Sequence, residues 1–112
     1  MFHAPDPIAG PWTPHAANPV VIDARCGRMA GGFLKTADSR PIRCGQVQGR
    51  KYGQEVSYRL ITELTETTYA ETPIENVAPI PVAPGARTHH VAARDGLIVV
   101  DECFVVPKWR RR

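Results

Sequence analysis

Hydrophobic and polar residues alternate with a period of two along residues 54–64. This is the spacing of a β-strand with one covered face, because successive side chains of a strand point to opposite faces. One predicted face holds Val56, Tyr58, Leu60, Thr62 and Leu64, and the other holds Glu55, Ser57, Arg59, Ile61 and Glu63. Tyr58, Ile61 and Leu64 also fit a helical spacing, but the four threonines within residues 62–68 favour a strand.

Shorter apolar segments, separated by turn residues, predict the other elements. We expect strands at residues 20–26, 33–36, 42–50, 67–71, 88–94 and 97–106, a short turn at 73–76, and an edge strand or extended connector at 77–82. Asp95-Gly96 lies between the last two strands and favours a tight hairpin turn. The pattern predicts a core that contains Tyr58, Leu60, Val99 and Phe104.

The composition supports a fold built from strands. Val and Ile together number 18 against four Leu, and β-branched residues pack well on a pleated sheet. Eleven prolines and nine glycines interrupt long elements. We therefore expect an all-β or mostly β domain, folded as a small barrel or sandwich.

Three segments resemble the strand, strand, short turn, strand order of the SH3-like barrels. They are Cys44-Gly-Gln-Val-Gln-Gly, Val56-Ser-Tyr-Arg-Leu and Pro73-Ile-Glu-Asn-Val-Ala-Pro-Ile80. The resemblance is one of pattern. It implies an SH3-like barrel as one form of the fold, and it assigns no activity to any residue.

Both ends of the chain differ from its middle. Residues 1–19 contain five of the eleven prolines, which cannot donate a backbone hydrogen bond, and this favours an extended arm. Residues 108–112 read Lys-Trp-Arg-Arg-Arg and form a basic tail. We therefore predict an arm at 1–19, a single β domain at 20–107 and a tail at 108–112, because a chain of 112 residues is typical of one domain.

Charge is distributed unevenly along the chain. The net charge is only +3, but residues 25–59 carry eight Lys or Arg against two acidic residues. Residues 60–78 carry four Glu and no basic residue. Such a chain can meet nucleic acid, an acidic protein surface or another copy of itself.

Few residues indicate catalysis or metal binding. Cys26, Cys44 and Cys103 are far apart in the sequence and form no Cys-X-X-Cys pair, so their spacing is not that of a zinc site. Ser39 and Ser57 lack the surroundings of a hydrolase nucleophile. We therefore expect no enzyme activity, no metal and no cofactor.

The sequence also predicts where the protein acts. No uninterrupted apolar run exceeds four residues, which is too short to span a membrane. The first residues lack the basic and apolar regions of a secretory signal. We expect a virion or cytoplasmic protein that is not exported by a signal peptide and has no membrane partner.

These observations favour a non-enzymatic structural or interaction protein of a large assembly. The most concrete form is a phage-like virion component, such as a head decoration, connector or tail protein, anchored by its two ends to other subunits and to copies of itself. The predicted partner-binding residues are Phe2, Ile8, Trp12, Lys108, Trp109, Arg110, Arg111 and Arg112.

Two alternatives remain. The first is a small SH3-like barrel that binds nucleic acid through basic residues and an aromatic ring that stacks on bases. Its predicted contacts are Arg43, Arg50, Lys51, Tyr52 and Arg59. The second alternative is a small inhibitor or adaptor protein.

Overall fold

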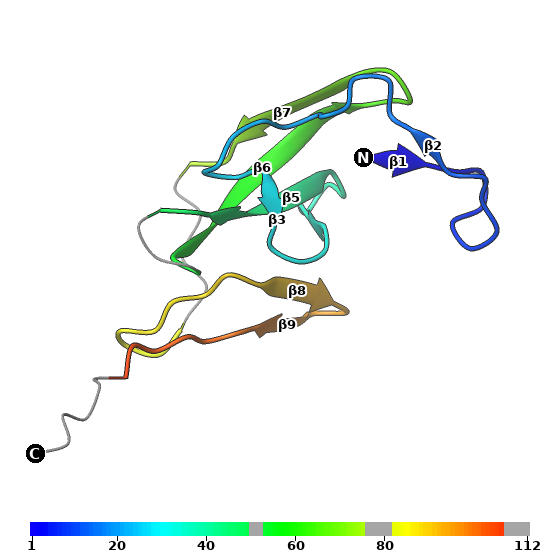
Figure 1. Ribbon diagram of the computed structural model, residues 1–112. Helices are drawn as coiled ribbons and strands as arrows, with labels where there is room; N and C mark the ends of the chain where they lie inside the picture. The colour runs from blue at the N-terminus through cyan, green and yellow to red at the C-terminus, as the bar shows by residue number, and fades with distance from the viewer. Residues whose placement is uncertain (50–52, 76–81, 107–112) are drawn as a thin grey trace, which may run out of the picture.

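The computed structural model describes residues 1–49, 53–75 and 82–106. This part of the chain contains strands and turns and no helix, which confirms the predicted all-β class. The strands are β1 (Phe2–His3), β2 (Thr13–Pro14), β3 (Arg28–Met29), β4 (Leu34–Lys35), β5 (Pro41–Val47), β6 (Glu55–Leu64), β7 (Tyr69–Pro73), β8 (Val91–Arg94) and β9 (Leu97–Val100). They form three separate sheets, and none of these closes into a barrel (Figure 1).

The main sheet is antiparallel and has the order β3-β5-β6-β7, with β4 also paired to β5. Its longest ladder joins β5 to β6, from the pair Ile42–Leu60 to the pair Val47–Glu55. β6 confirms the strand predicted from the alternating pattern. The predicted strand at 20–26 is wrong, because this segment forms a loop and a turn that lie against the sheet near Cys26.

Gly45 explains how this loop can lie so close to β5. A Cβ atom at Gly45 would collide with the backbone carbonyl oxygen of Cys26. Only glycine therefore allows the loop to pack directly on the strand. Residues 20–26 add no strand to the sheet; Cys26 at the end of the segment is buried, whereas Ile22 is 85% exposed.

The hydrophobic core lies on the opposite face of β5 and β6. Cys44, Val56, Ala30 and Val91 are its buried members, and the partly buried Leu34, Tyr58 and Val100 pack around them. Val91 belongs to β8, so the core joins the main sheet to the hairpin. Backbone bonds strengthen this connection, because the Val91 amide donates to the Ala30 carbonyl (2.7 Å) and the Ala30 amide donates to the Cys44 carbonyl (2.9 Å).

A β-bulge interrupts β6 near its end. The register pairs Ile61 with Glu71, then Glu63 with Ala70 and Leu64 with Tyr69. Thr62 is the extra residue, and a bulge of this kind shifts all later side chains by one position. Leu64 therefore lies on the face of Ile61, whereas strict alternation placed it on the face of Leu60.

β8 and β9 form the predicted hairpin. Asp95 and Gly96 have positive φ angles of 51° and 80°, as a type I′ turn requires at both central positions. The ladder ends at the pair Val91–Val100, so the strands are shorter than the sequence indicated. Val99 and Phe104 are more than half exposed, so their predicted place in the core is wrong, and Tyr58 and Leu60 are half-buried.

Residues 1–19 double back on themselves. Phe2 pairs with Pro14 and His3 with Thr13, so β1 and β2 form a short ribbon that projects from the main sheet (Figure 1). The ribbon differs from a single extended arm, because its two short strands pair with each other. The predicted connector at 77–82 lies almost wholly outside the described residues, and the basic tail lies entirely outside them.

Candidate interaction surface

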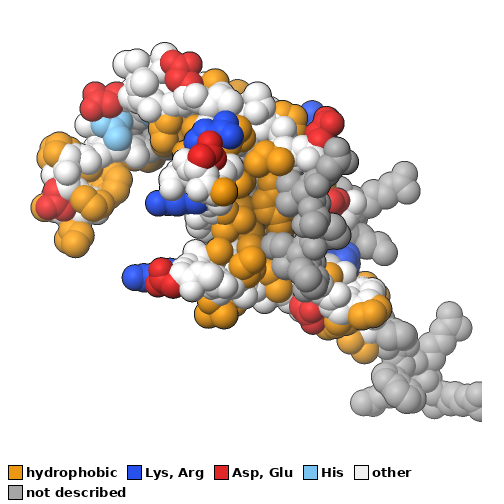
Figure 2. Space-filling model, turned by 180° about the vertical axis from the view of Figure 1, so that it is seen from behind, with side chains coloured by type: hydrophobic (Ala, Val, Ile, Leu, Met, Phe, Trp, Pro, Cys, Tyr) orange, Lys and Arg blue, Asp and Glu red, His pale blue; other side chains and the backbone are white. Residues whose placement is uncertain are grey.

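Large hydrophobic side chains are exposed at both projecting parts of the molecule. One group lies on the N-terminal ribbon, and the other lies on the hairpin and the segment that follows it. Figure 2 shows hydrophobic side chains at the end of the ribbon and in the hollow beside the hairpin. The exposed residues are Phe2, Ile8 and Trp12 in the first group, and Leu97, Ile98, Val99, Phe104, Val105 and Val106 in the second.

The end of the ribbon, residues 5–12, is called the arm tip below. The Asp6 side chain organises it, because Oδ1 of Asp6 accepts hydrogen bonds from the amides of Ile8 (2.7 Å) and Ala9 (2.9 Å). These bonds also lower the pKa of Asp6. The Gly10 amide donates to the Asp6 carbonyl (2.9 Å) and closes the turn. The turn leaves the Ile8 side chain 95% exposed.

His15 holds the base of the ribbon on the main sheet. Nδ1 of His15 accepts from the Ala17 amide (3.1 Å), so Nε2 carries the proton and donates to the Thr65 carbonyl (2.9 Å). The Ala16 amide also donates to the Glu66 carbonyl (3.3 Å). His15 is buried, although the surrounding residues are exposed. The ribbon is therefore anchored to the β6–β7 turn at its base and free at its tip.

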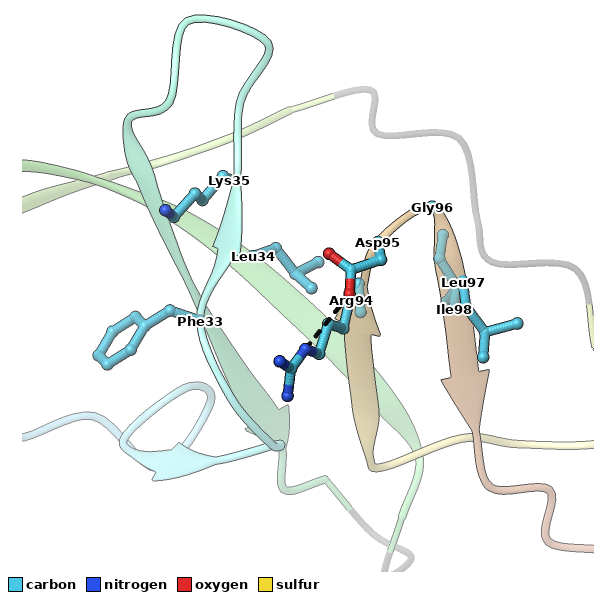
Figure 3. A pocket seen from close by; sticks show the side chains of 9 residues that line it. Phe33, Leu34, Lys35, Arg94, Asp95, Gly96, Leu97 and Ile98 are labelled. Atoms are coloured by element: carbon cyan, nitrogen blue, oxygen red, sulfur yellow. Dashed lines mark ion pairs between the residues drawn. The ribbon is translucent and has the colours of Figure 1, made fainter.

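The hairpin and β4 enclose an open cleft of about 490 Å³, called the hairpin cleft below. Its lining residues are Phe33, Leu34, Lys35, Ala93, Arg94, Asp95, Gly96, Leu97 and Ile98. Figure 3 shows Leu34 pointing toward the hairpin, Arg94 beside the hairpin turn, and Lys35 extending to the other side of β4. Ala93 and Ile98 pair with each other, two positions beyond the pair Val91–Val100. The cleft is thus an open extension of the hydrophobic core.

The other face of the main sheet holds a buried ion-pair cluster. Arg43 binds both carboxylate oxygens of Glu71, through Nε and Nη2 at 2.6 Å each. Arg59 Nε lies 2.7 Å from the same carboxylate, and the Tyr69 hydroxyl donates to it. The third Arg43 nitrogen, Nη1, donates to the Cys26 carbonyl (2.6 Å). The cluster thus connects β5, β6, β7 and the covering loop.

The cluster shifts the titration of its members. Burial alone would raise the pKa of Glu71, but the hydrogen bonds from Arg43 and Tyr69 and the charges of both arginines hold it below its ordinary value. Burial, then the hydrogen bond and charge of Glu71, raise the pKa of Tyr69 to about 12. The cluster therefore keeps Glu71 ionised and Tyr69 protonated near neutral pH, as a structural ion pair requires.

Two of the predicted nucleic-acid contacts, Arg43 and Arg59, belong to this cluster. Arg43 is only 3% exposed and its guanidinium is fully engaged, so it is not on a surface that phosphate could reach. Arg59 is partly exposed but also pairs with Glu71. Residues 50–52 lie outside the described residues, as do 108–112. Among the predicted partner-binding residues, the structure places Phe2, Ile8 and Trp12 together on the exposed ribbon.

Sequence reasoning missed the hairpin as part of this surface. Leu97, Ile98, Val99 and Val100 form one apolar run. The prediction of Val99 as a core residue overlooked that side chains on both faces of a two-stranded hairpin cannot all be covered. Sequence reasoning also missed His15. Its position within a proline-rich segment gave no signal of the two carbonyl groups that it meets.

Other candidate chemistry is sparse in the part of the chain that the structure describes. No three His, Cys, Asp or Glu side chains there converge as metal ligands would. Cys26 and Cys44 are buried, and Cys103 is partly exposed. Burial raises the pKa of the Cys44 thiol to about 11. Within the same residues, no helix is long and apolar enough to cross a membrane.

Comparisons with known proteins identify no relative. No family model, no curated protein and no solved structure matches the chain.

Proposed function

We propose that the protein is a non-enzymatic structural subunit of a large assembly, most concretely a phage-like virion component such as a head decoration, connector or tail protein. The observation that carries the proposal is the exposed apolar surface on both projecting parts, the ribbon and the hairpin. Monomeric soluble proteins rarely expose contiguous apolar patches beyond a few hundred Å². Subunits of an assembly cover such surfaces with their neighbours.

The ribbon supports the same proposal in a second way. Its base is fixed to the sheet by His15, whereas its tip holds Ile8 in an ordered turn that touches little of its own chain. A projecting element of this kind suits contact with a neighbouring subunit. The proposal has two further parts. The proline-rich N-terminal segment docks on a neighbouring subunit, and the basic tail, residues 108–112, binds an acidic patch of a neighbouring subunit.

Mass measurement of the native particle tests the proposal. We expect the full chain to form a discrete assembly at micromolar concentration that persists at high salt, because apolar contacts are not screened by ions. A monomer under these conditions would overturn the proposal. Binding of DNA or RNA with a steep salt dependence would favour the nucleic-acid alternative.

A further inference from the structure

The hairpin cleft is an incomplete part of the core. Val91 is fully buried, and Val100 packs beside it. Ala93 and Ile98 continue the same face of the hairpin toward its tip, yet Ile98 is 59% exposed. Leu34 packs against the core from the side of β4. One further apolar side chain placed between Leu34 and Ile98 would extend the core to the end of the hairpin.

The arm tip offers an apolar side chain in a suitable form. Ile8 is the most exposed large hydrophobic residue of the described part of the chain. The Asp6 hydrogen bonds and the prolines on either side already order the turn that presents it. A preorganised turn loses little conformational entropy on binding, so more of the contact energy remains as affinity.

Charge favours this pairing. Asp6 is the only charged residue of the arm tip, which therefore carries a charge of −1. Lys35 lies beside the hairpin cleft on the outer side of β4, and Arg94 at the border of the cleft pairs with Asp95 at 3.4 Å, so these three side chains together carry a net charge of +1. Opposite charges at the edge of an apolar contact select the partner and its orientation.

From these observations we propose that the arm tip of one copy inserts Ile8 into the hairpin cleft of a second copy. The inference rests on the proposed role in an assembly and names the contact that builds it. The ribbon is fixed at its base, and Figures 1 and 2 show open space between its tip and the hairpin of the same chain. The occupant of the cleft is therefore the arm tip of another copy.

The geometry of the assembly follows from this contact. The inserting surface and the receiving surface are different patches of the same chain, so each copy inserts into one neighbour and receives another. Such a head-to-tail contact produces a ring when the rotation closes and an open row when it does not. A reciprocal exchange of arm tips between two copies would instead close a two-fold symmetric pair, in which Ile8 of each copy meets Ile98 of the other.

Disulfide trapping between two single variants tests the contact. Ile8→Cys and Ile98→Cys are each prepared with Cys103→Ser, which removes the partly exposed native thiol. One variant is isotope-labelled so that mass spectrometry separates mixed dimers from self-dimers. Ile22→Cys replaces Ile8→Cys as the matched control, because Ile22 is 85% exposed and lies outside the arm tip.

We expect Ile8→Cys to form several-fold more mixed dimer with Ile98→Cys than Ile22→Cys does. Equal yields of mixed dimer would overturn the inference. A protein carrying both Ile8→Cys and Ile98→Cys that closes a disulfide within one chain, with no mixed dimer between the single variants, would also overturn it. That result would show that the arm tip occupies its own cleft.

Native mass measurement separates failure of this contact from failure of the proposed function. We expect Ile8→Glu to break the assembly into smaller species, whereas Ile22→Glu leaves its mass unchanged. An assembly that survives both Ile8→Glu and Ile98→Glu would overturn the contact and leave the proposed function standing. A wild-type chain that is already a monomer would overturn both.

Discussion

The two faces of the main sheet are completed in different ways. On one face, Arg43 and Arg59 pair with Glu71, and Arg43 also donates to the Cys26 carbonyl, so the charged groups find their partners within the chain. On the other face, the core begins at Cys44 and Val91 but stays open along the hairpin. The ion pairs of the polar face are therefore complete within the chain, and the apolar face is left partly uncovered.

The difference follows from the cost of leaving each kind of group unpartnered. A charge removed from water without a partner costs several kcal/mol, so a buried ion pair must be complete in every folded copy. Exposed apolar surface costs about 25 cal/mol per Å², which a stable fold can tolerate until a partner covers it. A complete ion-pair cluster on one face and open apolar surface on the other thus suit a subunit that folds first and assembles afterwards.

Removal of the Glu71 charge should have the largest effect. Glu71→Gln leaves Arg43 buried without a counter-ion, and loss of one partner of a buried pair costs about 3–5 kcal/mol. Chemical denaturation measures the change in the free energy of unfolding. Glu55→Gln is the control, because Glu55 is exposed on the same sheet, and its effect should stay within about 0.5 kcal/mol. Equal losses for the two variants would mean that the cluster is not a closed unit.

Truncation on the two faces of the hairpin should separate its covered and open sides, because Val91 faces the core and Val99, opposite Ala92, points to the other face. Val91→Ala removes two buried methyl groups at the core, and we expect a loss of about 2 kcal/mol. Val99→Ala alters a side chain that is 57% exposed, and we expect less than about 0.5 kcal/mol for the isolated chain. The measurement is thermal or chemical unfolding at a concentration below that of assembly. A large effect of Val99→Ala there would show that the outer face of the hairpin is covered within the chain.

Titration of Tyr69 should give the smallest effect, visible only at alkaline pH. Its pKa in the folded chain, about 12, lies above the ordinary value of about 10. The contribution of Tyr69 to stability is therefore complete below pH ~10 and is lost as the pH rises toward 12. Absorbance of the phenolate measures tyrosine titration, and Tyr69→Phe should remove the ionisation step that occurs at the highest pH. Tyr58→Phe is the control and should leave that step in place.

The sequence predicted the elements whose signal is local. The alternation in residues 54–64 identified β6, and Asp95-Gly96 identified the hairpin turn, because period and turn chemistry are read from neighbouring residues. The apolar surface of the ribbon was also visible in the sequence, since prolines exclude Phe2, Ile8 and Trp12 from a regular core element.

Features that depend on distant contacts could not be read in this way. Val20, Val21 and Ile22 predicted a strand, but the chain forms a loop there, and Gly45 on β5 lets the end of that loop, at Cys26, pack on the sheet. The exposure of Val99 depends on whether another part of the chain covers the outer face of the hairpin, opposite the face of Val91. The burial of Arg43 depends on Glu71, which is 28 residues away. An arginine in an alternating strand looks the same in sequence whether it meets solvent, phosphate or a buried carboxylate.

The bulge at Thr62 also has a consequence for insertions and deletions. Deleting a residue from the regular part of β6, such as Ser57, would turn over every side chain on one side of the deletion. Deleting Thr62 would only convert the bulge into a regular ladder, with Glu63 still opposite Ala70 and Leu64 still opposite Tyr69. Thr62 is therefore the position at which natural variation in the length of this strand is best tolerated, and a homologue one residue shorter there would keep the same two faces.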